Sequence, residues 1–355
     1  MVLGLVHVVS NSEDSYERGY ALGAQVKELV TTNVEVYMKR FRHYGLSRQS
    51  VLTMARKFKP LIEKHDEEMF QEIKGVAEST DTKLEEIIAL NVRYELLWGT
   101  WAGCTSIGIQ PEASQNGHTL VAQNWDWIDS VKDSCHTWRI TRKNKHEVLC
   151  FTEAGILGPK IGINSSGLSL CVNGLVSGAD GARKGVPFHL ITRRILNSTT
   201  MNEVLEFLGK ADRAGSANYL IGHAEGEILD VEASPNRLGY LSPTDGVVAH
   251  TNHFISLNLD DVGRRRFPDS VIRYFRCQRL LRLGRPTLSA NYLQAILKDH
   301  FNYPNSICCH PSESVPPEER EQTNASFVID LTDRSMLITK GPPCKNIYER
   351  FTLSS

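Results

Sequence analysis

Apolar residues recur every three or four positions between Asn11 and Leu97, which predicts a series of amphipathic helices. Ser12 and Ser15 have acidic residues close behind them and are the expected N-caps of the first helix. One continuous helix is expected over 52–80 and another over 84–98. The apolar positions that carry this pattern include Tyr16, Tyr20, Val26, Val30, Leu52, Phe58, Ile62, Met69 and Ile73.

The pattern changes after Gly103 to short apolar and alternating runs, which are typical of strands. The sequence Asn116-Gly117 predicts a hairpin between the first two of these runs, and Asp333-Arg334 is the expected turn of the last. Helices are expected over 189–198 and 201–211, and loops over 264–270 and 310–322. The strand-forming stretches are 104–110, 120–127, 136–143, 146–155, 160–175, 217–234, 238–243 and 323–341.

Helices followed by many strands with a few helices among them indicate an α+β fold in two or more layers. The chain has 355 residues, 41% of them hydrophobic, so it can bury a large core. Its net charge of −1 argues against nucleic acid or an anionic membrane as the main partner. The start lacks a basic leader region, and the end, FTLSS, is not a peroxisomal tripeptide. We therefore expect a cytoplasmic protein.

The eight cysteines are spread along the chain, so a disulfide scaffold is not expected. Cys308 and Cys309 form the one adjacent pair, and His310 follows them. Neighbouring thiols rarely point at one ion, and no second cluster is visible in the sequence. We therefore expect no metal site and no cofactor.

The Gly103-Cys104 pair at the start of the first strand suggests a different chemistry. If the peptide bond between them breaks, Cys104 carries a free α-amino group, whose pKa near 7.7–8.0 makes it a base for its own thiol. Glycine before the cysteine eases such self-cleavage, because glycine permits conformations barred to other residues. The alternative is a small buried thiol behind a turn glycine.

Several motifs together resemble a known family, the isopenicillin N acyltransferases, which are cysteine N-terminal-nucleophile hydrolases related to penicillin V acylases and bile salt hydrolases. The resemblance implies a four-layer αββα sandwich. It also implies that 1–103 is a helical pre-segment that becomes the α chain, and that 104–355 is the catalytic domain, or β chain. The motifs, in chain order, are YERGYALG, LNVRYE, GCTSI, AQNWDW, FTEAGILGPKIGINSSGL, GVPFHLITRRIL, AHTNHF and NYPNSIC.

The resemblance assigns roles to residues of these motifs. Cys104 matches the nucleophile that forms the acyl-thioester. Asn252 matches a side-chain oxyanion donor, although an Asx turn is the alternative. Asp126 matches an acid that holds the substrate amine or the new N-terminus, and a turn cap is the alternative. Asn173 offers a further amide, although a buried asparagine at a strand end commonly satisfies backbone groups.

Arg93 and Glu95, just upstream of the cut, belong either to the processing environment or to a structural ion pair. A departure from the family lies at Cys309, where the penicillin-forming enzymes have an arginine that holds the carboxylate of the penicillin nucleus. A neutral thiol cannot replace a guanidinium, so we expect a shifted acceptor unless Arg193 or His310 supplies the charge.

The function expected from the resemblance is transfer of an acyl group from acyl-CoA, as co-substrate, or from an amide donor onto an amine, in specialised metabolism such as formation of a penicillin-type amide. The expected partners are the small-molecule donor and acceptor and the chain's own cleaved α chain. Two alternatives stay open: an amidohydrolase that uses water as acceptor, and a catalytically silent binding relative.

Overall fold

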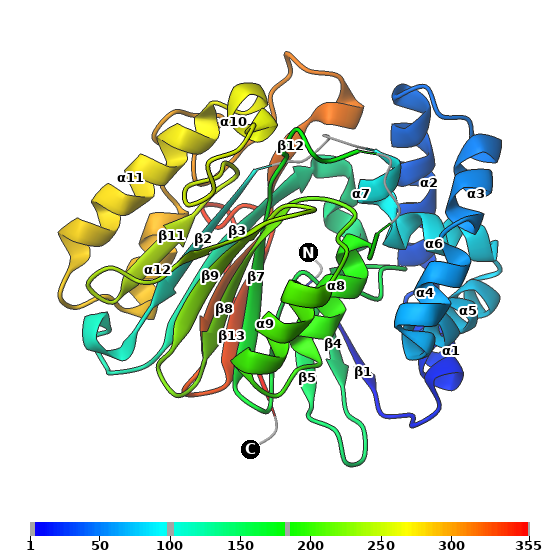
Figure 1. Ribbon diagram of the computed structural model, residues 1–355, viewed down its shortest axis with the longest axis horizontal. Coiled ribbons are helices and arrows are strands. Elements are labelled where there is room, and N and C mark those ends of the chain that lie inside the picture. Colours follow the sequence, from blue (N-terminus) through cyan, green and yellow to red (C-terminus); the bar gives the residue numbers. More distant parts are fainter. Residues whose placement is uncertain (1–3, 98–102, 182–184, 354–355) are drawn as a thin grey trace.

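The computed structural model describes residues 4–97, 103–181 and 185–353, and it contains two β-sheets that lie face to face between helices (Figure 1). Neighbouring strands are antiparallel except for β1 and β4, which are parallel. Within the described residues, the first sheet has the order β1 (Val6–Ser10), β4 (Cys135–Ile140), β5 (Val148–Glu153), β6 (Ile161–Asn164), β7 (Leu168–Gly174), β8 (Ala217–His223), β9 (Ile228–Ala233), β10 (Leu238–Leu241). The second has the order β11 (Val247–His250), β2 (Cys104–Ile109), β3 (Leu120–Ile128), β12 (Glu321–Asp330), β13 (Ser335–Lys340), β14 (Glu349–Thr352).

The inner faces of the two sheets form the core around the candidate site. Gln123 of β3 reaches across to β7, where its Nε2 donates to the carbonyl of Val172 over 2.6 Å and its Oε1 accepts from the Val172 N–H over 3.2 Å. Every residue of β2 and β3 is buried, because helices cover the outer face of their sheet as well. The polar residues of these strands, such as Gln123 and Asp126, are therefore buried together with the apolar ones.

Helices form the two outer layers. Those over the first sheet are α8 (Phe188–Leu196) and α9 (Met201–Lys210), and those over the second are α11 (Asp269–Gly284) and α12 (Ala290–Leu297), with α10 (Val262–Arg266) beside them (Figure 1). The predicted four-layer αββα sandwich is confirmed.

The segment before Cys104 is mostly helical and packs against one end of the sandwich (Figure 1). It also contributes β1, a strand that the sequence analysis did not anticipate. Asn33 and Asn91 fasten this segment to the sheet, because their Nδ2 atoms donate to the carbonyls of Ala154 and Gly155, both over 2.8 Å. Its helices are α1 (Ser15–Gln25), α2 (Lys27–His43), α3 (Arg48–Arg56), α4 (Lys59–His65), α5 (Glu67–Thr80), α6 (Leu84–Asn91) and α7 (Arg93–Leu96).

Two expectations for these helices were wrong. The N-cap of α1 is Asp14, whose carboxylate accepts from the Glu17 N–H over 2.8 Å, and not Ser12 or Ser15. The stretch 52–80 is divided among α3, α4 and α5, since Asp66 caps α5 by accepting from the Met69 N–H over 2.8 Å. A side-chain cap competes locally with continuation of the helix.

The stretch 84–98 divides at Val92 into α6 and α7, and its last position, Trp98, lies outside the described residues. The prediction of a loop over 264–270 was wrong, because α10 and the start of α11 occupy most of this stretch. The region 310–322 is largely irregular, as expected, with the short η3 (Pro317–Glu319) before β12.

Both predicted hairpins are present. The first joins β2 and β3 through 110–119, which includes η1 (Pro111–Ala113), and Gly117 takes a φ of 70° there. The second joins β12 and β13 at a turn in which Arg334 has a φ of 50°. A further 3-10 turn, η2 (Asp129–Ser134), follows β3. Among the described helices, none combines the length and apolar character needed to cross a bilayer.

Candidate active site

Cys104 is the first residue of β2, a strand flanked by β11 and β3 in the middle of its sheet. The residue is 5% exposed. Burial, together with the negative charge of Asp126, raises the pKa of the Cys104 thiol to about 12. In the intact chain the thiol is therefore protonated at neutral pH and needs a base before it can act as a nucleophile.

The peptide bond between Gly103 and Cys104 is held from both sides. The Gly103 carbonyl accepts a hydrogen bond from the backbone N–H of Asp126 over 3.0 Å. The Cys104 N–H donates to Oδ1 of Asn252 over 2.7 Å. One neighbour thus polarises the carbonyl, and the other binds the amide nitrogen of the same bond.

Gly103 lies in a crowded position. A Cβ atom at this position would lie 2.9 Å from Oδ2 of Asp126 and 3.3 Å from Nη2 of Arg273. Any side chain would therefore push against the two charged groups beside the peptide bond.

Asp126 lies in β3 and faces the nucleophile's end of β2, since its neighbour Trp125 pairs with Cys104. Its Oδ1 accepts from the Thr323 hydroxyl over 2.6 Å. Its Oδ2 is buried and has no hydrogen-bond partner among the described residues. Burial raises the pKa of Asp126 to about 6, against the opposing effect of the Arg273 guanidinium. Because Asp126 sits within a strand and bonds across to β12, it does not act as a turn cap.

Asn252 follows β11, and its side chain makes bonds to distant parts of the chain. Oδ1 accepts from Cys104 and, over 3.0 Å, from Nη2 of Arg273, which identifies this atom as the oxygen. Nδ2 donates to the carbonyl of Gly174 over 3.0 Å. These contacts differ from an Asx turn, which would bond the residue to its own backbone.

Arg273, on α11, is a site residue that the sequence analysis missed. Its side chain is buried, and its Nη1 donates to the Cys104 carbonyl over 2.7 Å. Its Nε donates to Asp269 over 3.0 Å. The sequence signal is weak, since five arginines occur between residues 273 and 285 and a run of this kind is usually a solvated face. Burial within the tertiary structure distinguishes Arg273 from its neighbours.

Arg93 and Glu95, expected either in the processing environment or in a structural ion pair, have different partners. Arg93 binds the buried carboxylate of Glu153 over 2.7 Å. Lys160 also donates to Glu153, and its ammonium lies 3.9 Å from the centre of the Trp125 ring, beside Cys104. Glu95 instead accepts from the Phe188 N–H over 2.7 Å, and burial raises its pKa to about 7.

Two further candidates serve structural contacts. Asn173 lies in β7, where its Oδ1 accepts from the Ser106 hydroxyl over 2.7 Å and its Nδ2 donates to the His250 carbonyl over 3.3 Å. Arg193, named as a possible substitute cation, pairs with Glu72 over 2.7 Å and is not among the residues that line the large cavity described next. It therefore cannot replace an arginine at position 309.

A cavity of about 960 Å³ opens beside the Gly103-Cys104 bond. Gly103, Asp126 and Cys309 lie in its wall together with several cationic groups. The Cys309 backbone is held by Thr323, whose hydroxyl accepts from the Cys309 N–H over 2.9 Å. Burial lowers the pKa of His310, which also lines the cavity, so this imidazole is neutral near pH 7 and does not supply the charge of an arginine. The charged residues of the wall are of both signs: Arg40, Arg266 and Arg273, and Asp126, Asp269, Glu319 and Glu321.

A second, much smaller space of about 10 Å³ lies on the other side of the nucleophile. It has room for about one water molecule. Its lining is mainly aromatic and apolar, and consists of Tyr94, Cys104, Trp125, Asp126, Trp127, Lys160, Val172, Gly174 and Phe188. Cys104 therefore lines the small apolar space, Gly103 lines the large polar cavity, and Asp126 lines both.

Comparisons with known proteins place the chain in a family. A family model described as acyl-coenzyme A:6-aminopenicillanic acid acyl-transferase matches residues 113–344, which is more than half of the chain. The chain is 29% identical over 359 residues to the acyl-coenzyme A:6-aminopenicillanic-acid-acyltransferase 40 kDa form of Emericella nidulans, covering 99% of this chain and 96% of that protein. It is 28% identical over 215 residues to acid ceramidase of Heterocephalus glaber, covering 52% of this chain and 53% of that protein.

Solved structures show weaker similarity. The conjugated bile acid hydrolase from Clostridium perfringens is 15% identical with a TM-score of 0.49, covering 71% of this chain and 97% of that chain. An N-acylethanolamine-hydrolyzing acid amidase ortholog from Caenorhabditis elegans is 14% identical with a TM-score of 0.48, covering 71% of this chain and 100% of that chain.

Proposed function

The chain belongs to the acyl-coenzyme A:6-aminopenicillanic acid acyl-transferase family and is an enzyme of the type that transfers or hydrolyses acyl groups, and on that basis we propose that it activates itself by cutting between Gly103 and Cys104. Cleavage would divide it into an α chain, 1–103, and a β chain, 104–355. Cys104 then becomes an N-terminal residue with its own base.

Self-cleavage begins when Sγ of Cys104 attacks the Gly103 carbonyl carbon. The thiol proton passes to the departing amide nitrogen, the C–N bond breaks, and a thioester joins Gly103 to Sγ. Water then hydrolyses the thioester, which restores the thiol and leaves a carboxylate on Gly103. The Asp126 N–H, already bonded to the attacked carbonyl, stabilises the negative charge that develops on its oxygen.

Acyl transfer uses the same thiol. The free α-amine of Cys104 removes the thiol proton, which a fully buried thiol with a pKa of about 12 would otherwise keep. The thiolate attacks the acyl carbonyl of the donor, and the leaving thiol or amine of the donor takes the proton. An acceptor amine then attacks the acyl-thioester on Cys104, the proton that it loses returns to Sγ through the α-amine, and the thiol is restored. Asn252 and Asp126 hold the α-amine in place.

The α chain stays associated after cleavage. Its strand β1 is paired with β4 inside the first sheet, from Val6 opposite His136 to Ser10 opposite Ile140. Its buried Arg93 pairs with Glu153 of the β chain, and separating two buried charges would be costly. Dissociation would also expose the apolar faces of the pre-segment helices.

The two compartments beside Cys104 indicate the substrate classes. The mainly aromatic and apolar lining of the small space matches the apolar end of an acyl group, from acyl-CoA or from an amide donor, in chemical character. Its volume of about 10 Å³ holds only about one water molecule, so binding of an acyl group there requires movement of the lining. The large cavity, whose wall carries three arginines and four acidic residues, suits a polar acceptor amine that has charged or hydrogen-bonding groups. Cys309 places a neutral side chain in this wall, and a penicillin-type nucleus is therefore handled less well than by a family member with arginine there.

The observation that carries this proposal is that both sides of one peptide bond, the Gly103 carbonyl and the Cys104 N–H, are bound by Asp126 and Asn252. Mass spectrometry of the purified protein tests it. We expect two chains that meet at Gly103 and Cys104. Cys104→Ala should remain a single chain of 39.8 kDa. The matched control Cys150→Ala, which changes another buried thiol, should still be cut.

Hydrolysis of the acyl-thioester on Cys104 is the second candidate function. The observation that favours it is the large cavity of about 960 Å³, which reaches Asp126 and has room for water beside the site. Incubation of the processed enzyme with an acyl-CoA and a series of amines distinguishes acyl transfer from hydrolysis. Amide product shows transfer, and free acid alone shows hydrolysis. An intact wild-type chain that forms no thioester would support the silent binding relative instead.

A further inference from the structure

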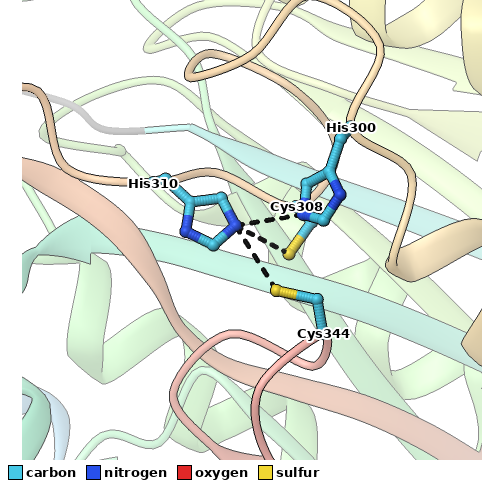
Figure 2. Close-up of side chains that lie close together, drawn as sticks. All are labelled: His300, Cys308, His310 and Cys344. Atoms are coloured by element: carbon cyan, nitrogen blue, oxygen red, sulfur yellow. Dashed lines mark hydrogen bonds between the residues drawn. The ribbon is translucent and has the colours of Figure 1, made fainter.

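Four sulfur and nitrogen donors converge on one point at the edge of the second sheet (Figure 2). They belong to His300, Cys308, His310 and Cys344, and one ligand atom from each lies within 4.8 Å of all the others. Three come from the turn-rich segment after α12, and Cys344 comes from the segment after β13. Cys308 and His310 are buried, whereas His300 and Cys344 are exposed, which leaves a path of entry from solvent.

The three separations from His310 to the other donors are close to those of a tetrahedral site, and the remaining separations are within 4.8 Å. Zn–S bonds of about 2.3 Å and Zn–N bonds of about 2.0–2.1 Å place tetrahedral ligands about 3.3 Å apart for two nitrogens and about 3.6 Å apart for sulfur and nitrogen. Nε2 of His310 lies 3.1 Å from Nε2 of His300. The same atom lies 3.5 Å from Sγ of Cys308 and 3.5 Å from Sγ of Cys344.

Hydrogen bonding alone does not account for the cluster. Nε2 of His310 has three close partners, yet a neutral imidazole nitrogen either donates one proton or accepts through one lone pair. The three dashed lines of Figure 2 all meet at this nitrogen. A cation at the centre of the four donors would satisfy all of them at once.

We propose that His300, Cys308, His310 and Cys344 form a structural zinc site. Two thiolates with two imidazole nitrogens in tetrahedral geometry are a donor set typical of Zn²⁺. On binding, the thiols of Cys308 and Cys344 each lose a proton to solvent and the two imidazoles bind as neutral groups. The two negative charges balance the metal, and no oxidation or reduction is involved.

The proposed site differs from the one considered from the sequence. The neighbouring thiols do not act together, because Sγ of Cys309 points toward the Glu321 carbonyl, 3.8 Å away, while Cys308 points into the cluster. The missing donors come from positions 300 and 344, which the fold brings to the buried Cys308-His310 pair. A sequence search for close spacings therefore misses the site.

A bound metal would hold one wall of the large cavity in a fixed position. His310 lines that cavity, as do Cys309 and four residues of the segment between His300 and Cys308. Zinc would tie this segment to the one that carries Cys344. We infer that the position of Cys309 in the acceptor pocket depends on the zinc site.

Metal analysis of the purified full-length protein tests the proposal. We expect one zinc per chain after dialysis, and near-complete loss in Cys308→Ser and Cys344→Ser. The matched control Cys309→Ser removes the adjacent thiol, which lies outside the cluster, and should retain the metal. Cys104→Ala should retain it as well, which excludes the nucleophile as a ligand. Co²⁺ exchanged into the wild type should show thiolate-to-metal charge transfer and the visible bands of a tetrahedral ion.

A thiol count distinguishes the zinc site from a disulfide. Denatured without reductant, a zinc-bound chain yields all eight cysteines as thiols, whereas a Cys308–Cys344 disulfide leaves six, that is, eight minus two. A count of six overturns the proposal, as does wild-type protein that lacks zinc and shows no tetrahedral Co²⁺ spectrum. If the serine variants fail to fold, His300→Ala, which changes an exposed ligand, should still lower zinc retention. Retention of one zinc per chain in that variant under chelator challenge would also count against the site.

Discussion

Asn252 and Cys104, 148 positions apart in sequence, are joined by one hydrogen bond in which the Cys104 N–H donates to the Asn252 side-chain oxygen over 2.7 Å. In the proposed reaction this N–H becomes the α-amine that activates the thiol. The intact chain therefore already holds the future base in the position where it is needed. Because these groups are already in position, they do not need to rearrange during the reaction.

Replacing Asn252 by alanine should slow self-cleavage about 10²-fold. The change removes the acceptor of both the Cys104 N–H and the Arg273 guanidinium and leaves two buried donors unpaired. The measurement is the rate at which the two chains appear after denatured protein is refolded. Asn258→Ala, an exposed position, is the control and should be cut at the normal rate. Equal rates for the two variants would rule out this role for Asn252.

Arg273→Lys should reduce both self-cleavage and acyl transfer about 10- to 100-fold. A lysine cannot bind the Cys104 carbonyl, Asn252 and Asp269 at the same time, and each lost charge-assisted hydrogen bond is worth about 1.5–3 kcal/mol. Arg279→Lys, on the exposed face of the same helix, should leave both rates unchanged. A normal processing rate in Arg273→Lys would show that the guanidinium geometry is dispensable.

The raised pKa of Asp126 predicts that the free energy of unfolding depends on pH. Burial raises its pKa from 3.8 to about 6, so the folded chain binds this proton more tightly than the unfolded chain does. The free energy of unfolding should therefore fall as pH rises from about 4 to 6, by up to about 3 kcal/mol relative to an Asp126→Asn variant.

Urea unfolding at several pH values measures this difference. Both proteins should carry Cys104→Ala, so that each remains one chain and differences in cleavage do not enter the comparison. Parallel pH profiles for the two proteins would mean that Asp126 titrates normally in the folded state.

Cys309→Arg should raise acylation of 6-aminopenicillanic acid about 10- to 100-fold. The new guanidinium would face the large cavity and bind the carboxylate of the acceptor by a charge-assisted hydrogen bond. Self-cleavage should stay unchanged, because the Cys309 side chain does not contact the Gly103-Cys104 bond through any hydrogen bond in the described residues. Cys309→Ser, which adds no charge, is the control. A wild-type protein that already acylates this substrate as fast as Cys309→Arg would refute the role given to position 309.

The sequence by itself determined the elements whose signals are local. Alternating runs with the turns at Asn116-Gly117 and Asp333-Arg334 predicted the two hairpins, because side-chain period and turn chemistry operate over a few residues. The Gly103-Cys104 pair and the motifs around Asp126 and Asn252 also pointed to one site, and the fold does bring these residues together. The helical character of the first segment was predicted, but its division into α3, α4 and α5 was not. The cap at Asp66 separates α4 from α5, and Pro60 lies in the first turn of α4.

Only the tertiary structure decided which charged and polar groups meet. Arg273 is one of several arginines on α11, and burial against Cys104 alone gives it a place in the site. Arg93 binds Glu153 rather than its sequence neighbour Glu95, because the fold brings β5 beside it. Cys344 and His310 lie 34 positions apart and meet at 3.5 Å. Contacts of this kind depend on packing between distant segments, and a pattern read along one segment does not contain them.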